Sequence, residues 1–409
     1  MLQKKSYCFV VPRFSEEIIG GAETLVANIA ARLYERGDEV LVLTTCSKDN
    51  RTWDNEYPEG DAVEFGVPVK RFKVDERDLE SWIPKQISLS EGMMLSLEDQ
   101  FEWMKHSVNS ISLYQYLADH AASFNAIFFA PYLFGTTFWG SLIHPKNSYL
   151  IPCLHDEVYA YVDVIQSMFR QVSGCLFNAK PEMELARRLY GDVKGDEVGM
   201  GFVEHSPEYL SSLKPYFKDD FPYIVYIGRK ETGKNVQLLI DYFIQAKNNQ
   251  DLPEVVKLVI AGGGSFEDLH RPEALNRNDV LDIGRLSDED KNRIIKYATA
   301  LCQPSTNESF SIVLMEAWLL GTPVIVHSDS QVTRHHVIKS NGGLYFKNQQ
   351  EFSSISKLLV NDKQLAQTMA ESGYNYTIKE YSWDAVMQRF DQTVCQLLED
   401  QFKQEDLGD

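Results

Sequence analysis

The sequence predicts an α/β protein made of two domains, each with a parallel sheet and crossover helices. The chain has 409 residues, which fits two domains of about 150–200 residues better than one core. Short apolar runs of strand character alternate with longer amphipathic segments, as in parallel sheets connected by helices. Residues 204–222 are polar and carry Pro207, Pro215 and Pro222, which indicates an exposed interdomain connection.

In the first half, the helix over residues 22–36 is the most clearly marked element. Leu25, Ile29 and Leu33 share one stripe of it, and Gly37 closes it. Residues 96–124 are also expected to be helical and are rich in aromatic residues. The expected strands are 7–12, 39–45, 67–74, 127–132, 149–154 and 175–178. These elements place the N-terminal domain at residues 1–205.

In the second half, the helix predicted over residues 288–300 begins with Ser287 and Asp290 at capping-box spacing. The expected strands are 223–227, 256–261, 280–283, 301–304, 324–326 and 344–346. This second alternating series places the C-terminal domain at residues 206–382. Two such halves imply two Rossmann-like domains that face each other across a central cleft.

The bulk composition narrows the classes of function. With 44% hydrophobic and 24% charged residues, the chain has the composition of a soluble globular protein. Its net charge of −19 argues against a nucleic-acid partner and gives no support for attraction to anionic lipid. Six scattered cysteines without zinc-ligand spacing predict reduced thiols in a cytosolic protein. The apolar run after Lys5 is too short for a signal peptide or membrane span.

The most informative segment runs from Leu301 to His327. A short strand is followed by a polar loop with Glu308, then by an apolar helix that Gly321 stops. Glu316 is the only formal charge between Phe310 and Val326. A carboxylate on such a helix must either face solvent or have a partner, and a ligand hydroxyl is one such partner. Glu308 follows the strand, at the edge where open parallel sheets bind ligands.

This segment resembles the donor-site motif of retaining glycosyltransferases of the GT-B fold, specifically family 4, glycosyl transferases group 1. The resemblance implies that Glu308 contacts the transferred sugar and that Glu316 holds the ribose of a nucleotide donor. It is strongest from about residue 223 to 346. Serines at 309 and 311 stand where the family usually has glycines. The Tyr381-Ser382-Trp383 sequence resembles the point where many such chains cross back, so residues 383–409 are expected to complete the first domain.

Breaking the bond to a nucleotide diphosphate leaves negative charge, which a metal, cationic side chains or helix N-termini can stabilise. No aspartate pair of the DxD type follows a strand. The strand at 223–227 instead leads into Gly-Arg-Lys-Glu-Thr-Gly-Lys-Asn, which resembles the family's cationic pair and assigns it to Arg229 and Lys234. We therefore expect catalysis without a metal ion or other cofactor.

Other positions take a role only through the resemblance. The glycine loop at Gly20 and Gly21 would touch the diphosphate, and His155, expected directly after a strand, would bond the sugar. The remaining donor-site candidates are Ser309, Phe310, Ser311, Ile312, Gly263, Arg285 and Leu286. A turn histidine and ordinary glycine turns are the alternative interpretations of these motifs.

The resemblance implies transfer of a sugar, with retention, from a nucleotide-diphosphate sugar to a hydroxyl of a glycan or lipid-linked acceptor. Bacterial envelope polysaccharide or glycoconjugate synthesis is the expected setting, in the cytoplasm with possible peripheral contact at the inner face of the membrane. A nucleotide-sugar epimerase of the same fold and a non-catalytic nucleotide-binding subunit stay open as alternatives. The donor sugar, the acceptor and the oligomeric state are not determined by the sequence.

Overall fold

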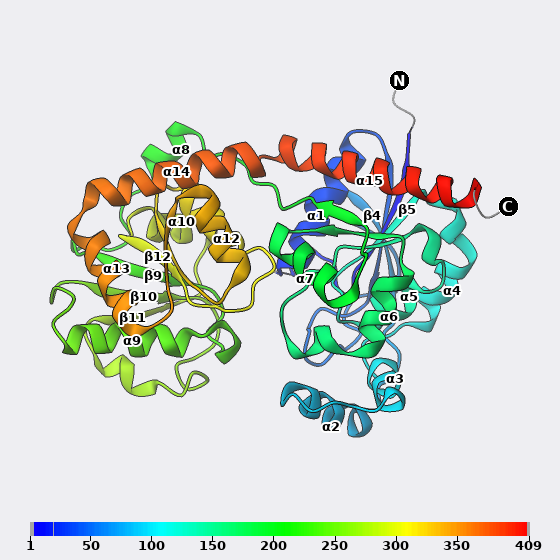
Figure 1. Ribbon diagram of the computed structural model, residues 1–409, viewed down its shortest axis with the longest axis horizontal. Coiled ribbons are helices and arrows are strands. Elements are labelled where there is room, and N and C mark those ends of the chain that lie inside the picture. The colour runs from blue at the N-terminus through cyan, green and yellow to red at the C-terminus, as the bar shows by residue number, and fades with distance from the viewer. Residues whose placement is uncertain (1–3, 19, 407–409) are drawn as a thin grey trace. The chain divides into compact units, whose positions relative to one another are not determined.

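The computed structural model describes residues 4–18 and 20–406, which form two compact units. Unit 1 comprises residues up to Gly199 together with Met387 onward, and unit 2 comprises Met200–Val386. The sequence prediction placed the same divisions at 205/206 and 382/383. Figure 1 shows the elements of both units. No helix among the described residues is both long and apolar enough to cross a membrane.

Unit 1 contains an eight-stranded sheet in the order β3-β4-β2-β1-β5-β6-β7-β8. All neighbours are parallel except β3 and β4. Without β3 and β8, this is the 3-2-1-4-5-6 order of a Rossmann fold. Its strands are β1 (Ser6–Val10), β2 (Glu39–Thr45), β3 (Gly60–Glu64), β4 (Val67–Phe72), β5 (Ala126–Phe129), β6 (Ser148–Leu150), β7 (Gly174–Phe177) and β8 (Gly195–Glu197).

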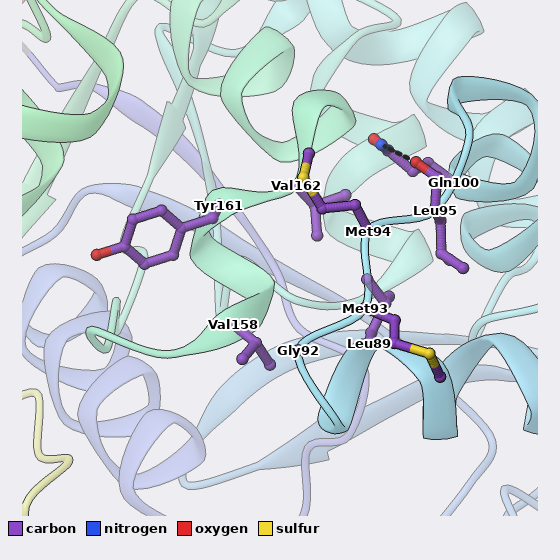
Figure 2. A pocket seen from close by; sticks show the side chains of 9 residues that line it. All are labelled: Leu89, Gly92, Met93, Met94, Leu95, Gln100, Val158, Tyr161 and Val162. Atoms are coloured by element: carbon purple, nitrogen blue, oxygen red, sulfur yellow. Dashed lines mark hydrogen bonds between the residues drawn. The ribbon is translucent and has the colours of Figure 1, made fainter.

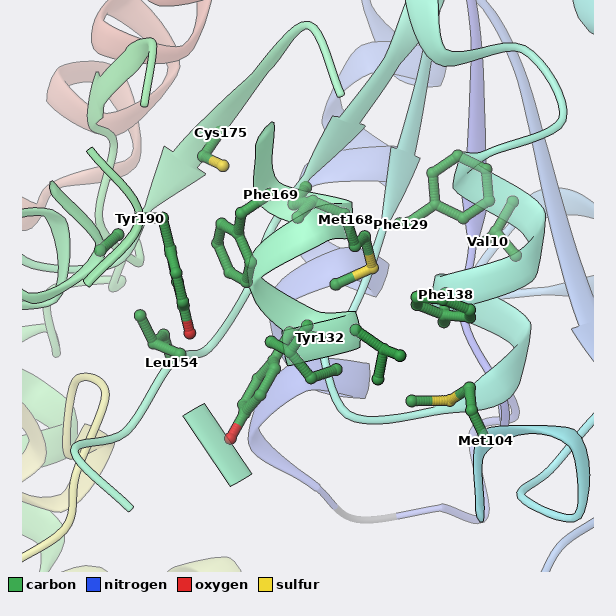
Figure 3. Close-up of a cluster of buried hydrophobic side chains, with 14 of the residues drawn as sticks. Val10, Met104, Phe129, Tyr132, Phe138, Leu154, Met168, Phe169, Cys175 and Tyr190 are labelled. Carbon is green, nitrogen blue, oxygen red and sulfur yellow. The ribbon is translucent and has the colours of Figure 1, made fainter. Parts of the chain in front are cut away.

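Helices cover this sheet and enclose a core of aliphatic, aromatic and sulfur-containing side chains, part of which Figure 3 shows. The C-terminal helix contributes to the unit, because the Phe390 ring lies 6.0 Å from Tyr7 and 5.5 Å from Phe128. The helices are α1 (Gly21–Glu35), α2 (Leu79–Ser90), α3 (Leu97–Lys105), α4 (Ile111–His120), α5 (Gly135–Ser141), α6 (Asp163–Gln171), α7 (Lys180–Tyr190) and α15 (Trp383–Asp406).

Unit 2 has a six-stranded parallel sheet in the order β11-β10-β9-β12-β13-β14, again the 3-2-1-4-5-6 order. The chain moves outward from β9 to β10 and β11, then crosses to β12 on the other side of β9. The strands are β9 (Tyr223–Ile227), β10 (Lys257–Ala261), β11 (Val280–Gly284), β12 (Ala300–Gln303), β13 (Val324–His327) and β14 (Gly343–Phe346). The helices are α8 (Pro207–Ser212), α9 (Val236–Asn248), α10 (Asp288–Lys296), α11 (Ile312–Leu319), α12 (Gln331–Ser340), α13 (Gln349–Asn361) and α14 (Lys363–Tyr381).

The parallel α/β architecture predicted from the alternation is confirmed, but several local predictions are wrong. The helical stretch 96–124 is two helices, because Asn109 donates to the carbonyls of Met104 and Lys105 and ends α3 there. The strand predicted at 149–154 ends at Leu150, and Cys153 breaks the extended backbone with φ +52°. His155 therefore lies in a loop and does not directly follow a strand.

Three further differences concern shorter segments. The sequence prediction missed the edge strand β3 and the helix α2, which contains Pro84. The helix predicted over 288–300 ends at Lys296, since Ala300 already belongs to β12. The connection at 204–222 contains α8, and Tyr209 accepts a hydrogen bond of 2.8 Å from Asn292 of α10. That segment is therefore attached to unit 2.

Candidate active site

The donor-site residues of unit 2 gather where β9 and β12 end. The strand order reverses between these two neighbours, and open α/β sheets bind ligands at the carboxyl ends of such strands. After β9 the chain forms a short 3-10 turn over Thr232–Lys234. After β12 it forms the loop with Glu308. Asn235 joins the two loops through a hydrogen bond of 3.1 Å from its side-chain amide to the carbonyl of Pro304.

An ion pair lies at this point. The Lys234 Nζ is 2.8 Å from the Glu308 Oε1, with the two side chains 26% and 10% exposed. The resemblance implied a separate role for each residue, and the structure brings the two side chains together. Each charge is thus neutralised by the other, and the lysine is still accessible enough to exchange partners. Arg229 lies apart from this pair, since its exposed guanidinium is 3.1 Å from Glu231.

The helix after the loop, α11, begins with unusual geometry. Ser311 is its N-cap with φ +72°, in the left-handed region that non-glycine residues rarely adopt. Its side chain is buried, and the Oγ has no hydrogen-bond partner among the described residues. The first amides of a helix have no intrahelical acceptor and favour anions. Strain together with an unsatisfied hydroxyl at a helix start is typical of a functional loop.

Aromatic side chains pack against Phe310, in the loop that precedes α11. The Phe310 ring is buried, 5.1 Å from the His336 ring and 5.0 Å from the Tyr381 ring. His336 is fully buried, and its Nδ1 lies 3.0 Å from the Tyr376 hydroxyl. Burial, with the neighbouring His335, lowers the pKa of His336 to about 3. The histidine is therefore a neutral packing group. Ser309 and Ile312, on either side, are half-buried.

Glu316, on α11, does have a partner within the unit. Lys291 of α10 donates to the Glu316 Oε1 at 2.9 Å, and Lys291 is also 3.3 Å from Asp288. Burial would lower the pKa of Lys291, but the Glu316 and Asp288 carboxylates outweigh it and hold that pKa above its ordinary value. Sequence reasoning missed Lys291. Lys291 directly follows the capping-box residue Asp290, and nothing in that local pattern indicates that its side chain contacts Glu316 on another helix.

A second missed residue, Lys230, joins the loops on the other side of β9. Its side chain is 1% exposed, and its ammonium donates to the Gly262 carbonyl at 2.6 Å and to Asp282 at 3.0 Å. Asp282 in turn accepts from the Gly284 amide at 3.0 Å. The glycine turn is needed here, because a Cβ on Gly262 would lie 1.8 Å from the Gly228 carbonyl oxygen. Lys230 thus fixes the ends of β9, β10 and β11 to one another.

The remaining donor-site candidates follow β10 and β11. The Arg285 side chain extends to Gly263, where an added Cβ would be 3.0 Å from its Nε. Leu286 is half-buried beside it. Arg285 is exposed and adds a further cation to Arg229, Lys230 and Lys234 in the loops at the carboxyl edge of the sheet. No group of three His, Cys, Asp or Glu side chains within 4–18 and 20–406 is placed to hold a metal ion.

Unit 1 contains the other predicted residues. Gly20 is the N-cap of α1, and an added Cβ would lie 2.1 Å from a Glu23 carboxylate oxygen, while Gly21 is exposed. Arg13, after β1, pairs with Glu23 at 2.7 Å and is a cation that sequence reasoning missed. His155 is half-buried, with its Nδ1 3.7 Å from Glu157.

Glu182 positions the segment that leads to His155. Its buried carboxylate accepts from the Leu154 amide at 2.6 Å and from the Asn178 amide at 2.5 Å. The loop after β6 and the end of β7 are thereby joined. Burial raises the pKa of Glu182 to about 8, and the amide hydrogen bonds oppose this only in part.

Comparisons with known proteins find similarity in this part of the chain. Residues 212–376 match the family described as glycosyl transferases group 1. The chain is similar to this family over that segment, which is less than half of its length. The segment covers the loops that hold Arg229, Lys234, Glu308 and Glu316, so the similarity to group 1 glycosyltransferases lies in the unit in which the motif resemblance was strongest.

Curated relatives match over similar lengths. A Methanocaldococcus jannaschii protein described as an uncharacterized glycosyltransferase is 28% identical over 181 residues, which are 41% of this chain and 43% of the relative. The D-inositol 3-phosphate glycosyltransferase of Jonesia denitrificans is 27% identical over 173 residues, 39% of this chain and 40% of the relative. The chain thus spans less than half of the length of these relatives.

Solved structures extend the likeness to both units. Sucrose-phosphate synthase from Thermosynechococcus elongatus aligns with a TM-score of 0.70 at 16% identity, over 97% of this chain and 100% of that one. The Anabaena protein HepE, solved with UDP and glucose, gives a TM-score of 0.68 at 17% identity, over 96% and 99%. At these identities the likeness concerns the fold, and it confirms the GT-B prediction.

Proposed function

We propose that this protein is a retaining glycosyltransferase, which moves a sugar from a nucleotide-diphosphate donor to a hydroxyl of a glycan or lipid-linked acceptor. Envelope polysaccharide or glycoconjugate synthesis is the setting we infer for it. The family match supports the reaction class, and the UDP complex of HepE supports a nucleotide-sugar donor.

The observation that carries this proposal is the Lys234–Glu308 ion pair between the loops after β9 and β12. A donor diphosphate would draw the Lys234 ammonium toward its own charge. The Glu308 carboxylate would then be free to accept hydrogen bonds from sugar hydroxyls. The Lys234 and Glu308 side chains are largely buried, and charge–charge interactions there are stronger than in water.

The reaction breaks the bond between the anomeric carbon and the diphosphate oxygen, and the electron pair stays on the diphosphate. Lys234, Arg229 and the first amides of α11 stabilise that developing charge. The acceptor oxygen bonds to the anomeric carbon on the face that the diphosphate leaves. The acceptor proton passes to the departing diphosphate oxygen, so no separate base is required. These cationic groups make a metal ion unnecessary in the proposed mechanism.

Glu316 has the ribose as its proposed ligand. Lys291 holds the Glu316 carboxylate in place through a contact of 2.9 Å. The ribose diol would donate to the carboxylate oxygens, which accept better when charged. Lys291 is then a positioning residue for the nucleotide.

The test uses purified protein, a panel of radiolabelled nucleotide sugars and an excess of chelator. Transfer to an acceptor in chelator, with an α-linked product from an α-donor by anomeric proton coupling, is the expected result. Loss of transfer in chelator that added magnesium or manganese restores would contradict a metal-independent mechanism. A β-linked product would contradict a retaining mechanism. Conversion of the donor to its epimer, without transfer, would favour an epimerase. Nucleotide-dependent stabilisation without turnover would indicate a non-catalytic subunit.

A further inference from the structure

Unit 1 contains an apolar hollow that the proposed donor chemistry does not use. It lies between the α2–α3 hairpin and the 3-10 turn at Val158–Tyr161. Buried Leu89, Gln100 and Val162 line it, together with exposed Met93, Met94 and Val158, and its volume is about 280 Å³. Figure 2 shows Met94 beside Val162, and Val158 and Met93 near Gly92.

Exposed apolar side chains are concentrated around this hollow. Of the 20 large apolar side chains that are exposed in the described part of the chain, nine lie within residues 79–101 or 158–161. Leu79, Ile83 and Ile87 share one face of α2 at helical spacing, and Leu97 and Phe101 do so on α3. Single exposed apolar residues need no explanation, but a contiguous group marks a binding surface.

The two polar side chains that line the hollow, Gln100 and Tyr161, already have partners. The Gln100 amide donates to the Leu95 carbonyl at 3.1 Å and to Asp163 at 2.9 Å, and its oxygen accepts from the Val164 amide at 3.2 Å. The Tyr161 hydroxyl donates to Asp156 at 2.6 Å. A ligand in this hollow would contact apolar side chains, and the polar side chains beside it are already hydrogen-bonded within the protein. A sugar or nucleotide needs several hydrogen-bonding partners, so neither fits as the occupant.

The charge around the hollow selects against anionic lipid. Between residues 79 and 105 there are five acidic residues and two lysines. Both lysines are already near carboxylates, Lys85 at 3.6 Å from Asp99 and Lys105 at 3.0 Å from Glu102. An anionic membrane surface attracts basic segments, and this one is acidic. The occupant that fits is an uncharged aliphatic chain.

The size of the hollow sets the length of that chain. An apolar protein cavity of about 150 Å³ holds benzene, so a cavity of about 280 Å³ holds about eleven carbon atoms by the same ratio. The two flexible methionines at the rim can adapt to chains of different shape.

We propose that this hollow binds the aliphatic chain of a lipid-linked acceptor, with about eleven of its carbons enclosed by α2, α3 and the Val158–Tyr161 turn. That the bound molecule is an acceptor rests on the proposed function. The chain-binding site itself rests on the apolar lining, the satisfied polar groups and the acidic surroundings.

The test measures binding of hexyl, octyl, decyl and tetradecyl maltosides to the full-length protein below their critical micelle concentrations. Affinity should rise about fourfold per methylene, which corresponds to about 0.8 kcal/mol. It should level off beyond about eleven carbons, where further methylenes find no cavity. The Val158→Glu and Met94→Glu variants place a charge at the exposed rim without disturbing the core. Each should weaken decyl binding at least about tenfold. Val63→Glu, at an exposed valine of β3, is the matched control and should bind like the wild type.

Affinity that does not depend on chain length, or equal weakening by Val158→Glu and Val63→Glu, would overturn the proposal. Binding to neutral vesicles without binding to single chains would assign the face to a bilayer. A dimer that Val158→Glu dissociates would assign it to a second copy of the chain. With a turnover assay, the KM of an alkyl-linked acceptor should fall as its chain lengthens, and Val158→Glu should abolish that trend. If no nucleotide sugar is turned over, the proposed function fails while the maltoside result still decides the chain site.

Discussion

The two units hold their key carboxylates in different ways. In unit 2, Glu308 and Glu316 each face a lysine from another element, and both are partly exposed. In unit 1, Glu182 is fully buried and held by two backbone amides. An ion pair near the surface can exchange a partner for a ligand at small cost, whereas a buried carboxylate held by amides cannot. The carboxylates of unit 2 are therefore suited to binding, and Glu182 is suited to holding the chain.

We expect the largest effect on activity when a cationic side chain of unit 2 is removed. We predict that Lys234→Ala lowers kcat by about a hundredfold to a thousandfold, because one charge-stabilising group is worth about 3–4 kcal/mol of barrier. Protein folding should survive, since the lysine is at the edge of the sheet. Steady-state kinetics at saturating donor measure the effect. Lys357→Ala, at an exposed lysine of α13, is the control, and a Lys234 variant within threefold of wild type would remove this residue from the mechanism.

In unit 1, we predict that Glu182→Gln destabilises the protein by about 1–3 kcal/mol, because the amide nitrogen cannot accept from a backbone N–H. Hydrogen exchange at Leu154 and Asn178 should become faster, while unit 2 peptides keep their protection. Equal protection in the variant and the wild type would show that other contacts hold the loop before His155.

Glu182 also predicts a pH dependence. Because burial raises its pKa to about 8 from an ordinary value near 4.5, the folded state keeps a proton that the unfolded state releases. This contribution to stability is complete below pH ~4.5 and is lost as pH rises through about 8. The urea midpoint of the wild type should therefore fall relative to that of Glu182→Gln over this range. Parallel pH profiles would contradict the raised pKa.

A smaller effect is expected at Glu316. We predict that Glu316→Gln weakens nucleotide binding about fivefold to tenfold, because a neutral amide oxygen accepts the ribose hydroxyls less well than a carboxylate. The kcat at saturating donor should change little. Calorimetry with nucleoside diphosphates measures the affinity. Lys291→Met should weaken binding in the same direction, and unchanged affinity in both variants would leave the Glu316–Lys291 pair with a structural role alone.

The smallest effect concerns Ser311. We predict that Ser311→Gly stabilises unit 2 by about 0.5–1 kcal/mol, because glycine relieves the left-handed strain and removes a buried hydroxyl without a partner. The melting temperature measures it. If nucleotide affinity falls in the same variant, the hydroxyl binds the donor. A lower melting temperature would show that Ser311 is not strained.

Local sequence was sufficient for much of unit 2. The strand at 223–227 and the start of α10 at Ser287 follow from apolar runs and capping chemistry, which depend on neighbouring residues. In unit 1, the prediction of one helical stretch over 96–124 was wrong because the Asn109 side chain bonds to the last carbonyls of α3 and ends that helix. The prediction of a strand over 149–154 was wrong because Cys153 adopts a positive φ, which the residue types in this segment do not indicate. Such features are set by a single residue and leave the hydrophobic pattern intact.

The sequence alone determined the parallel α/β class, the resemblance of the donor half to group 1 glycosyltransferases, and the candidates Arg229, Lys234, Glu308 and Glu316, because periodicity and motif spacing are local properties of the chain. Only the tertiary structure decided their partners. Lys291 is 25 residues from Glu316 and Lys234 is 74 residues from Glu308, and which strand ends meet depends on the order of the strands in the sheet. The hollow beside α2 was likewise invisible, because a stripe of apolar residues on a helix has the same pattern whether the fold covers it or leaves it exposed.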